Sequence, residues 1–370
     1  MPKALLFANT DWYIYNFRLA LAKELQTRGN EVILVSPPGD FHKHLQASGF
    51  EWIPFSLSRQ GTNPISELKT LWQLIRLYYR IKPDIVHHFT IKPVIYGSLA
   101  AHFLGIKGII NSITGLGHLF IDPGLSTRII REFTKILYRL SLHRTQVIFE
   151  NPEDQNTFIK NRFLKPEQTH LIPGTGVNVD KFPPVKSENE IPLVLFASRL
   201  LATKGLREFV EAAYILKQKG IRARFAIAGT PDPGNPASIP PEEITTWEEA
   251  GVVEIWGWQS DMPFILAQTD IFCLPSYREG VPSALLEACA SALPIVATDV
   301  PGCRDVVIHD INGLLVPPQN SKALADALKK LITSPDLRDQ MGKSGRHFAL
   351  EKFSLDKIIQ QTLDIYPNLF

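Results

Sequence analysis

Residues 275–302, PSYREGVPSALLEACASALPIVATDVPG, place two carboxylates, Glu279 and Glu287, eight residues apart around the start of an expected helix. We expect a short buried strand at 271–274 and a loop at 277–281. Pro282, a residue favoured in the first turn of a helix, then opens a helix that runs to about residue 291. Glu279 would lie in the loop and Glu287 on the helix.

The chemistry of this loop and helix suits a nucleotide-sugar. Free N–H groups of a first helical turn, here from Ser283 onward, favour phosphate. A carboxylate has two acceptor oxygens and no donor, so Glu287 is expected to bind a ribose diol and Glu279 the transferred hexose. The alternative is two surface charges, the commoner fate of glutamate, although ALLEACASALPIV around Glu287 shows no evident solvated face.

The spacing of the two glutamates resembles the E-x7-E motif of glycosyltransferase family 4, whose members have the GT-B fold. Four other stretches resemble that family in the same order: FTIKPVIYGSLAAHFLGIKGIINSITGLGHLF (89–120), PGTGVNVDKF (173–182), ASRLLATKG (197–205) and VPGCRDVVIHDINGLLVPP (300–318). The first of these is similar to a subgroup that builds bacterial polysaccharides and lipid-linked oligosaccharides. The resemblance therefore covers nearly the whole chain.

The resemblance implies roles for several residues. Arg199 and Lys204 would hold the leaving diphosphate, and Gly280, Val281 and Ser283 would join the donor site. Preorganised cations stabilise the negative charge that develops on a departing nucleoside diphosphate. Arg199 and Lys204 are alternatively a strand-end charge and a helix-cap lysine.

The expected architecture is α/β, with two Rossmann-like domains whose parallel sheets face an interdomain cleft. The chain has 370 residues, enough for two domains of ordinary size. We expect an N-terminal acceptor-binding domain at 1–182, a C-terminal donor-binding domain at 183–350, and a helix at 351–370 that crosses back to the first domain. The polar, proline-flanked stretch at 183–192 is the expected linker.

Short apolar runs alternate with helical patterns along the chain, which favours mainly parallel sheets covered on both faces. Strands are expected at 4–8, 31–36, 52–55, 85–88, 108–113, 147–150 and 170–172, and then at 193–197, 223–228, 252–255, 271–274, 295–297 and 313–316. Helices are expected in the first half at 16–28, 66–82, 93–104, 126–142 and 152–160, with a last helix at about 355–365.

Composition narrows the function classes. A formal net charge of +2 does not suggest a nucleic-acid partner. The three cysteines lack metal-ligand spacing, which indicates reduced core thiols in a cytoplasmic protein. No segment reaches the roughly 18 uninterrupted apolar residues of a spanning helix, so we expect any membrane contact to be peripheral, on the inner face of the cell membrane.

We expect no cofactor and no metal. The chain has no two aspartates separated by one residue, the D-x-D pattern with which other glycosyltransferases recruit a divalent cation, and the two cations would replace the metal. The resemblance implies retention of anomeric configuration through front-face attack, in which the leaving diphosphate takes the acceptor's proton. No protein nucleophile is then required.

The acceptor side is less determined. Many members of the family carry a histidine just after the strand that corresponds to 108–113, whereas this chain has Thr114 there. Thr114 takes that place with His118 reaching in from the loop, or His118 has no role. Lys92, at the start of the helix expected at 93–104, is either a cation for an acceptor phosphate or a plain surface lysine.

Two helices are candidates for contact with an anionic membrane surface. The helix expected at 126–142 has an apolar stripe beside Arg128, Arg131, Lys135 and Arg139, and residues 69–82 combine Trp72 with tyrosines and cations. Basic amphipathic helices bind anionic lipid. Any surface helix, however, turns an apolar face toward its own core.

These observations predict a cytoplasmic, membrane-associated, metal-independent retaining glycosyltransferase. It would move a hexose or N-acetylhexosamine from a UDP-sugar to a polyprenyl-diphosphate-linked saccharide in the assembly of a cell-surface glycan. The alternatives are a soluble acceptor, a sugar-nucleotide epimerase of the same fold, and a non-catalytic sugar-nucleotide-binding subunit. The intact set of Arg199, Lys204, Glu279 and Glu287 disfavours the last two.

Overall fold

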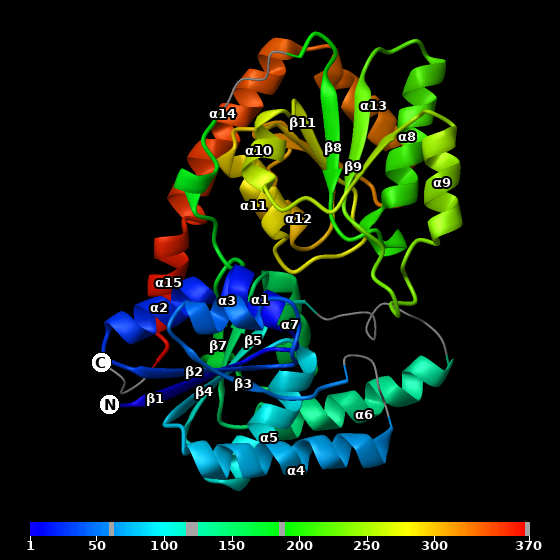
Figure 1. Ribbon diagram of the computed structural model, residues 1–370. Coiled ribbons are helices and arrows are strands. Elements are labelled where there is room, and N and C mark those ends of the chain that lie inside the picture. The colour runs from blue at the N-terminus through cyan, green and yellow to red at the C-terminus, as the bar shows by residue number, and fades with distance from the viewer. Residues whose placement is uncertain (59–62, 116–124, 185–188, 367–370) are drawn as a thin grey trace. The chain divides into compact units, whose positions relative to one another are not determined.

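The computed structural model describes residues 1–58, 63–115, 125–184 and 189–366 and divides them into two compact units (Figure 1). The first unit comprises Met1–Thr175 together with the segment that begins at Ile358, and the second comprises Gly176–Lys357. The second unit begins before the expected boundary at 182 because Val177 and Phe182 are buried in its hydrophobic core. Residues 185–188 of the expected linker lie outside the described residues.

The first unit is built on a seven-stranded sheet in the order β3-β2-β1-β4-β5-β6-β7, in which every neighbouring pair is parallel. The strands are β1 (Lys3–Phe7), β2 (Glu31–Ser36), β3 (Glu51–Pro54), β4 (Ile85–Phe89), β5 (Gly108–Ile113), β6 (Gln146–Phe149) and β7 (Thr169–Leu171). Its central strands are almost wholly buried, as expected for parallel strands that helices cover on both faces.

The helices of the first unit mostly follow the predicted pattern, except for the short α3 (His42–Ala47), which was not expected, and for differences at the helices expected at 16–28 and 93–104. They are α1 (Asp11–Phe17), α2 (Leu19–Thr27), α3 (His42–Ala47), α4 (Pro64–Ile81), α5 (Ser98–Phe103), α6 (Leu125–Ser141) and α7 (Pro152–Lys160). The helix expected at 16–28 starts earlier, because the Thr10 hydroxyl accepts the Tyr13 N–H at 3.1 Å, and it breaks at Arg18 (φ −126°, ψ −6°). The helix expected at 93–104 opens with a π-helical turn, Pro93–Gly97.

The second unit has a six-stranded sheet in the order β10-β9-β8-β11-β12-β13, again with every neighbouring pair parallel. The strands are β8 (Leu193–Ala197), β9 (Arg224–Ala228), β10 (Glu254–Gly257), β11 (Ile271–Leu274), β12 (Ile295–Thr298) and β13 (Gly313–Val316). The two parallel sheets confirm the expected α/β class.

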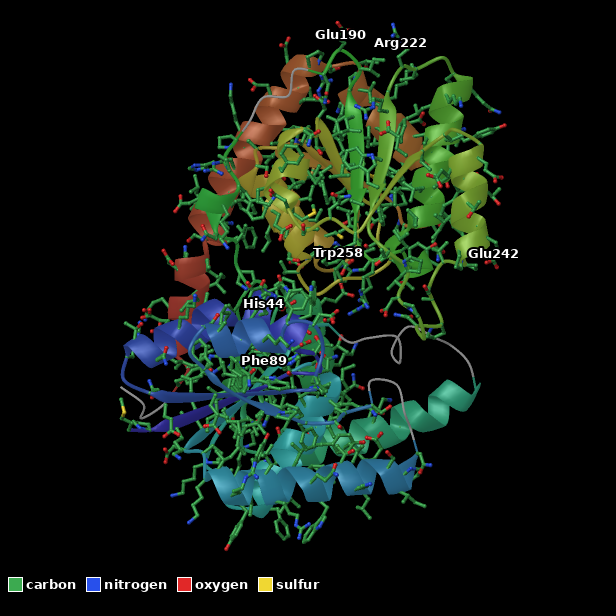
Figure 2. The ribbon with its side chains drawn as sticks, in the orientation of Figure 1. His44, Phe89, Glu190, Arg222, Glu242 and Trp258 are labelled. Atoms are coloured by element: carbon green, nitrogen blue, oxygen red, sulfur yellow. The ribbon has the colours of Figure 1, made fainter. Side chains whose placement is uncertain are left out.

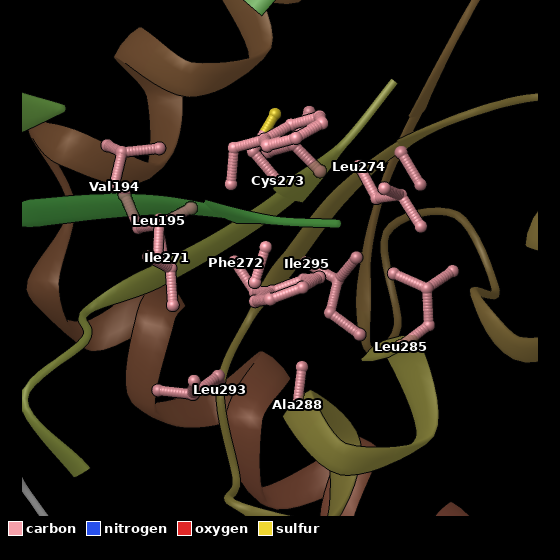
Figure 3. Close-up of a cluster of buried hydrophobic side chains, with 14 of the residues drawn as sticks. Val194, Leu195, Ile271, Phe272, Cys273, Leu274, Leu285, Ala288, Leu293 and Ile295 are labelled. Atoms are coloured by element: carbon pink, nitrogen blue, oxygen red, sulfur yellow. The ribbon is translucent and has the colours of Figure 1, made fainter. Parts of the chain in front are cut away.

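Helices flank this second sheet, and α11 positions the candidate site. They are α8 (Leu206–Gln218), α9 (Pro241–Glu249), α10 (Met262–Ala267), α11 (Ser283–Ala290), α12 (Cys303–Val306), α13 (Ser321–Ile332) and α14 (Pro335–Lys352). Leu285 and Ala288 of α11 point into the core beside Phe272 of β11 and Ile295 of β12 (Figure 3). This packing anchors the helix that carries Glu287 to the centre of its sheet.

Each sheet has one point at which the order of its strands reverses. In the first unit the chain builds outward from β1 to β3 and then returns to β4 on the other side of β1. In the second unit the same reversal separates β8 from β11. Ligands of open α/β sheets bind beyond the carboxyl ends of the strands at such a switch point. The topology therefore gives each unit one favoured place for a ligand.

The last helix, α15 (Leu355–Leu363), supplies residues to the first unit. Ile358, Leu363 and Tyr366 are buried in one of the hydrophobic clusters of that unit. The Tyr366 hydroxyl is hydrogen-bonded to Nδ1 of the buried His87, on β4, at 2.6 Å. Among the described residues, none of the helices is both long and apolar enough to cross a bilayer.

Candidate functional site

Two loops leave the second sheet at the switch point between β8 and β11. The loop after β8 passes through Arg199 into a short 3-10 helix, Ala202–Lys204, and the loop after β11 carries Glu279 toward α11. Because β8 and β11 are parallel neighbours, both loops leave at the same edge of the sheet. The residues that are predicted to bind the diphosphate and the sugar thus follow two adjacent strands of the sheet.

Lys204 and Glu279 form an ion pair between these two loops, Nζ to Oε1. Their side chains are only 18% and 10% exposed. A partly buried pair is screened by solvent far less than a surface pair, so the attraction between the two side chains is stronger than at the surface. The structure therefore brings together Lys204, which is predicted to bind the diphosphate, and Glu279, which is predicted to bind the hexose. The sequence predicted separate roles for them and no contact between them.

The backbone of three loops fixes this pair in place. Tyr277 N–H donates to the Thr203 carbonyl at 2.9 Å, and Glu279 N–H donates to the Pro301 carbonyl at 3.3 Å. Gly205 and Gly302 have φ of +72° and +80°, and a Cβ on either would lie within about 2 Å of a carbonyl oxygen of the loop after β11. Only glycine permits this conformation and this close approach.

Arg199 is 53% exposed and forms an ion pair with Asp232, Nη1 to Oδ2 at 2.6 Å. Asp232 lies in the loop after β9, at the same edge of the sheet. The Asp232 side chain is only 15% exposed, so the pair is open to solvent on its arginine side alone. On that side the guanidinium is accessible to a phosphate. Asp232 was not predicted as a site residue. The only sign of it in the sequence was its position after an expected strand.

Glu287 lies on α11, one turn beyond Ser283, and the two positions share a helical face. This face is half-buried, whereas Leu285 and Leu286 beside it are fully buried. Burial raises the pKa of the Glu287 carboxyl to about 7. Glu287, for which the sequence also allowed a solvent-exposed position, is thus a partly desolvated acid beside the first turn of the helix.

The start of α11 differs slightly from the prediction. Pro282 has an extended backbone (ψ 117°) and is the N-cap residue, so the helix itself begins at Ser283. The Pro282 carbonyl accepts the N–H groups of Leu285 and Leu286. Gly280 and Val281 are buried in the loop that leads into this cap. The three expected donor-site residues Gly280, Val281 and Ser283 therefore lie in one tight turn that leads into the helix.

The acceptor-side candidates have different outcomes. Thr114 directly follows β5 at the carboxyl edge of the first sheet and is half-buried. His118 lies outside the described residues. Lys92 forms an ion pair with Glu67 of α4, Nζ to Oε1 at 2.6 Å, in which both side chains are mostly buried. Glu67 neutralises the cation proposed for an acceptor phosphate, and this pair could not be predicted from the sequence.

Other side chains near the site have structural roles. Tyr277 donates its hydroxyl to Glu208 Oε1 at 2.6 Å, which ties the loop after β11 to α8. Cys273, Cys289 and Cys303 are free and buried, as the sequence predicts. Within the described ranges, no group of three or more His, Cys, Asp or Glu side chains could hold a metal ion. Metal independence itself stays a prediction.

Two family models match the chain, one in each unit. The model described as Glycosyl transferase 4-like matches residues 3–151, and the model described as Glycosyl transferases group 1 matches residues 179–348. An N,N'-diacetylbacillosaminyl-diphospho-undecaprenol alpha-1,3-N-acetylgalactosaminyltransferase from Campylobacter jejuni is 32% identical over 96% of this chain and 96% of its own length. The chain belongs to family 4 of the glycosyltransferases.

Further relatives of this glycosyltransferase agree with that assignment. A UDP-Gal:alpha-D-GlcNAc-diphosphoundecaprenol alpha-1,3-galactosyltransferase from Escherichia coli is 26% identical over 82% of this chain and 80% of its own. The solved structure of a sucrose-phosphate synthase from Thermosynechococcus elongatus has a TM-score of 0.80 and 21% identity, covering 100% of this chain and 99% of that one. The structural similarity confirms the expected GT-B fold of the glycosyltransferase.

Proposed function

We propose that this glycosyltransferase transfers a hexose or N-acetylhexosamine, with retention of configuration, from a UDP-sugar to a polyprenyl-diphosphate-linked saccharide during assembly of a cell-surface glycan. The observation that carries the proposal is the Lys204–Glu279 ion pair at the switch point of the second sheet. The names of the Campylobacter and Escherichia relatives support the acceptor class, and the latter name supports a UDP-sugar donor.

The donor is expected to bind along the edge of the second sheet. Its diphosphate would take hydrogen bonds from Lys204 and Arg199 and from the first-turn N–H groups of α11. Glu279 would accept from hydroxyls of the sugar, and Glu287 from the ribose diol. When the sugar binds, Lys204 would be shared between Glu279 and the diphosphate, which gives the cation a fixed position before the reaction starts.

The reaction then needs charge stabilisation more than a protein nucleophile. The bond between the anomeric carbon and the diphosphate oxygen breaks, and UDP leaves with the bonding electrons. The acceptor hydroxyl oxygen bonds to the same face of that carbon, and the departing diphosphate takes the hydroxyl proton. Lys204 and Arg199 would stabilise the negative charge that grows on the diphosphate, a contribution that is large when the groups are already in place.

A donor and acceptor panel tests this proposal. Purified enzyme is incubated with UDP-, GDP- and ADP-sugars and either a short-chain prenyl-diphosphate-linked saccharide or the same saccharide without lipid, and release of nucleoside diphosphate is followed. We expect release with UDP-sugars and the prenyl-linked acceptor, and an α-linked product from an α-linked donor by NMR. Equal rates with the lipid-free saccharide would favour a soluble acceptor, and an inverted product would contradict retention.

We also propose that the enzyme is peripheral on the inner face of the cell membrane and contacts it through α4. Ile65, Leu68, Trp72 and Tyr79 of α4 are all exposed, and their spacing places them on one face of the helix. Exposed cations lie among them at Lys69, Arg76, Arg80 and Lys82. An apolar stripe interleaved with cations is complementary to an anionic lipid surface. The exposed face of α4 thus defines which side chains of residues 69–82 would contact the membrane.

A further inference from the structure

A buried guanidinium lies at the switch point of the first sheet. Arg18, at the break between α1 and α2, is only 6% exposed. Its Nε and Nη2 donate to the hydroxyl of Tyr13 at 3.2 and 2.7 Å. Its Cζ lies 4.4 Å from the centroid of the Phe89 ring and 5.4 Å from that of Tyr13. Two aromatic side chains therefore fix the plane of this cation.

The charge of Arg18 has no acidic partner among the described residues. No Asp or Glu forms an ion pair with it, and Tyr13, its hydrogen-bond partner, is a neutral phenol whose pKa is raised chiefly by burial. The charge of Glu150, which follows β6, also raises the pKa of Tyr13. A buried cation without a counter-ion is costly, and contact with aromatic faces offsets only part of that cost.

The neighbouring residue on β4 adds an independent sign of a ligand site. Phe89, in the interior of the first unit (Figure 2), is the last residue of β4. Thr90 follows it with φ of +71°, a conformation that a β-branched residue rarely adopts. The Thr90 hydroxyl oxygen is buried and has no hydrogen-bond partner in the part of the chain that the structure describes. Strained residues of this kind cluster at ligand sites.

All of these features meet where the order of strands in the first sheet reverses. Arg18 follows β1 through α1, Phe89 and Thr90 end β4, and β1 and β4 are neighbours. This is the place where an open α/β sheet binds its ligand. Lys92, the cation that the sequence suggested for this side, is already paired with Glu67. Among the described residues, Arg18 is a cation at this edge that forms no ion pair with a carboxylate.

We propose that Arg18 is the residue of the first unit that binds the diphosphate of the prenyl-linked acceptor, with the Thr90 hydroxyl as a second donor. The proposal rests on the proposed function for the identity of the acceptor. Tyr13 and Phe89 hold the planar guanidinium so that its Nη1 can donate a hydrogen bond to an oxyanion. Arginine is the side chain best matched to phosphate. The donor candidates, in contrast, all belong to the second unit.

Steady-state kinetics on Arg18→Gln and Arg18→Lys test the proposal with the same prenyl-diphosphate-linked acceptor and UDP-sugar. Loss of charge-assisted hydrogen bonds to phosphate should raise the KM for the acceptor by about 100-fold in Arg18→Gln, and by about 10-fold in Arg18→Lys, which keeps the charge but not the fork. The KM for the UDP-sugar should not change. Arg28→Gln is the matched control, since Arg28 is a surface residue at the C-cap of α2 and is paired with Glu24 at 2.9 Å.

Calorimetry gives a second readout that does not need turnover. Farnesyl diphosphate should bind the wild type and bind Arg18→Gln about 100-fold more weakly, whereas UDP should bind both equally. An unchanged acceptor KM in Arg18→Gln, or weaker UDP binding in place of weaker farnesyl diphosphate binding, would overturn the inference. If Arg18→Gln does not fold, an unchanged KM in Arg18→Lys has the same meaning. If the wild type transfers no sugar, the proposed function is overturned too. That outcome is distinct from an unchanged acceptor KM in Arg18→Gln, which overturns only the inference about Arg18.

Discussion

At the scale of single residues, the site is organised by charges that already have partners. Lys204 is paired with Glu279, Arg199 with Asp232, and Lys92 with Glu67. The burial of each pair decides how freely its cation can turn to a ligand, because desolvated pairs are costly to separate and exposed pairs are not. Lys204 is therefore a fixed element of the donor site, and Arg199 an adjustable one.

Replacing Lys204 tests the fixed cation. Lys204→Ala should lower kcat by about 100- to 1,000-fold, since a preorganised group that stabilises the leaving diphosphate is lost. Lys219→Ala is the control, because Lys219 is an exposed lysine that forms a surface ion pair with Asp326 on α13. Steady-state kinetics with the native donor measure the effect. Near-normal turnover in Lys204→Ala would contradict the diphosphate role.

The raised pKa of Glu287 predicts a dependence of stability on pH. In the folded protein this carboxyl has a pKa of about 7, whereas an unfolded glutamate titrates near 4.3. Between those values the folded state holds more protons than the unfolded state, so stability falls as pH rises through this window. Glu287→Gln removes this contribution.

Urea unfolding of wild type and Glu287→Gln from pH 4.5 to 8 measures that difference. The advantage of Glu287→Gln in free energy of unfolding should be small at the acid end, should grow as pH approaches 7, and should level off above it. Glu249→Gln, on the exposed end of α9, controls for loss of a negative charge. A difference that does not vary with pH would show that Glu287 titrates normally.

At the scale of elements, the strands could be predicted closely and the breaks in helices could not. Five expected strands match their observed bounds, such as Gly108–Ile113, because a parallel strand covered on both faces is a continuous apolar run whatever surrounds it. The short α3 and the break at Arg18 depend on contacts with residues elsewhere in the chain. An example is the contact between the Arg18 guanidinium and the Phe89 ring. Local sequence carries no sign of such a partner.

The same reason separates the parts of the site that the sequence indicated from those that it did not. Glu279, Glu287 and Lys204 lie in motifs with a fixed spacing, so each could be named before the fold was known. Asp232 and Arg18 owe their positions to strands brought together by the sheet order. Pattern within one segment cannot reveal a pair that joins two segments.

The exposed face of α4 predicts binding to anionic vesicles. The enzyme should sediment with them at low salt and be released as salt shortens the reach of surface charge from about 10 Å at 0.1 M to about 3 Å at 1 M. Leu68→Ser with Trp72→Ser should weaken the apolar part of binding, and Lys69→Glu with Arg76→Glu the electrostatic part, each while activity on a short soluble acceptor analogue persists.

Tyr214→Ser with Lys217→Glu provides a matched control, because both residues are exposed on α8, in the second unit. This control variant should sediment as the wild type does. A wild type that stays in the supernatant with anionic vesicles at low salt would contradict the membrane proposal. Release by the α8 changes but not by the α4 changes would show that another surface makes the contact.

At the scale of the whole molecule, the proposed donor and acceptor residues belong to different units. The donor-site candidates all belong to Gly176–Lys357, whereas Arg18, Thr90 and Thr114 belong to the first unit. Variants in one unit should therefore change the kinetic constants of one substrate with little effect on the other. This division follows from the topology, since each parallel sheet has its own switch point.

Transfer should also survive removal of divalent cations. Lys204 and Arg199 are placed to supply the positive charge that a metal would bring to the diphosphate. Initial rates in excess EDTA should equal those of the untreated enzyme, and a metal-dependent glycosyltransferase assayed in parallel shows that chelation is complete. Activity that disappears with EDTA and returns with Mg²⁺ or Mn²⁺ would refute metal independence.

The contribution of α15 to the first unit has a consequence for how the protein is made. Ile358, Leu363 and Tyr366 complete a core that begins at β1, and Tyr366 bonds to His87. During synthesis, the ribosome must finish the whole second unit before the first can close its own interior. A chain cut after Lys357 should therefore expose apolar surface and recruit chaperones, and a separate peptide of residues 355–366 should restore its folding.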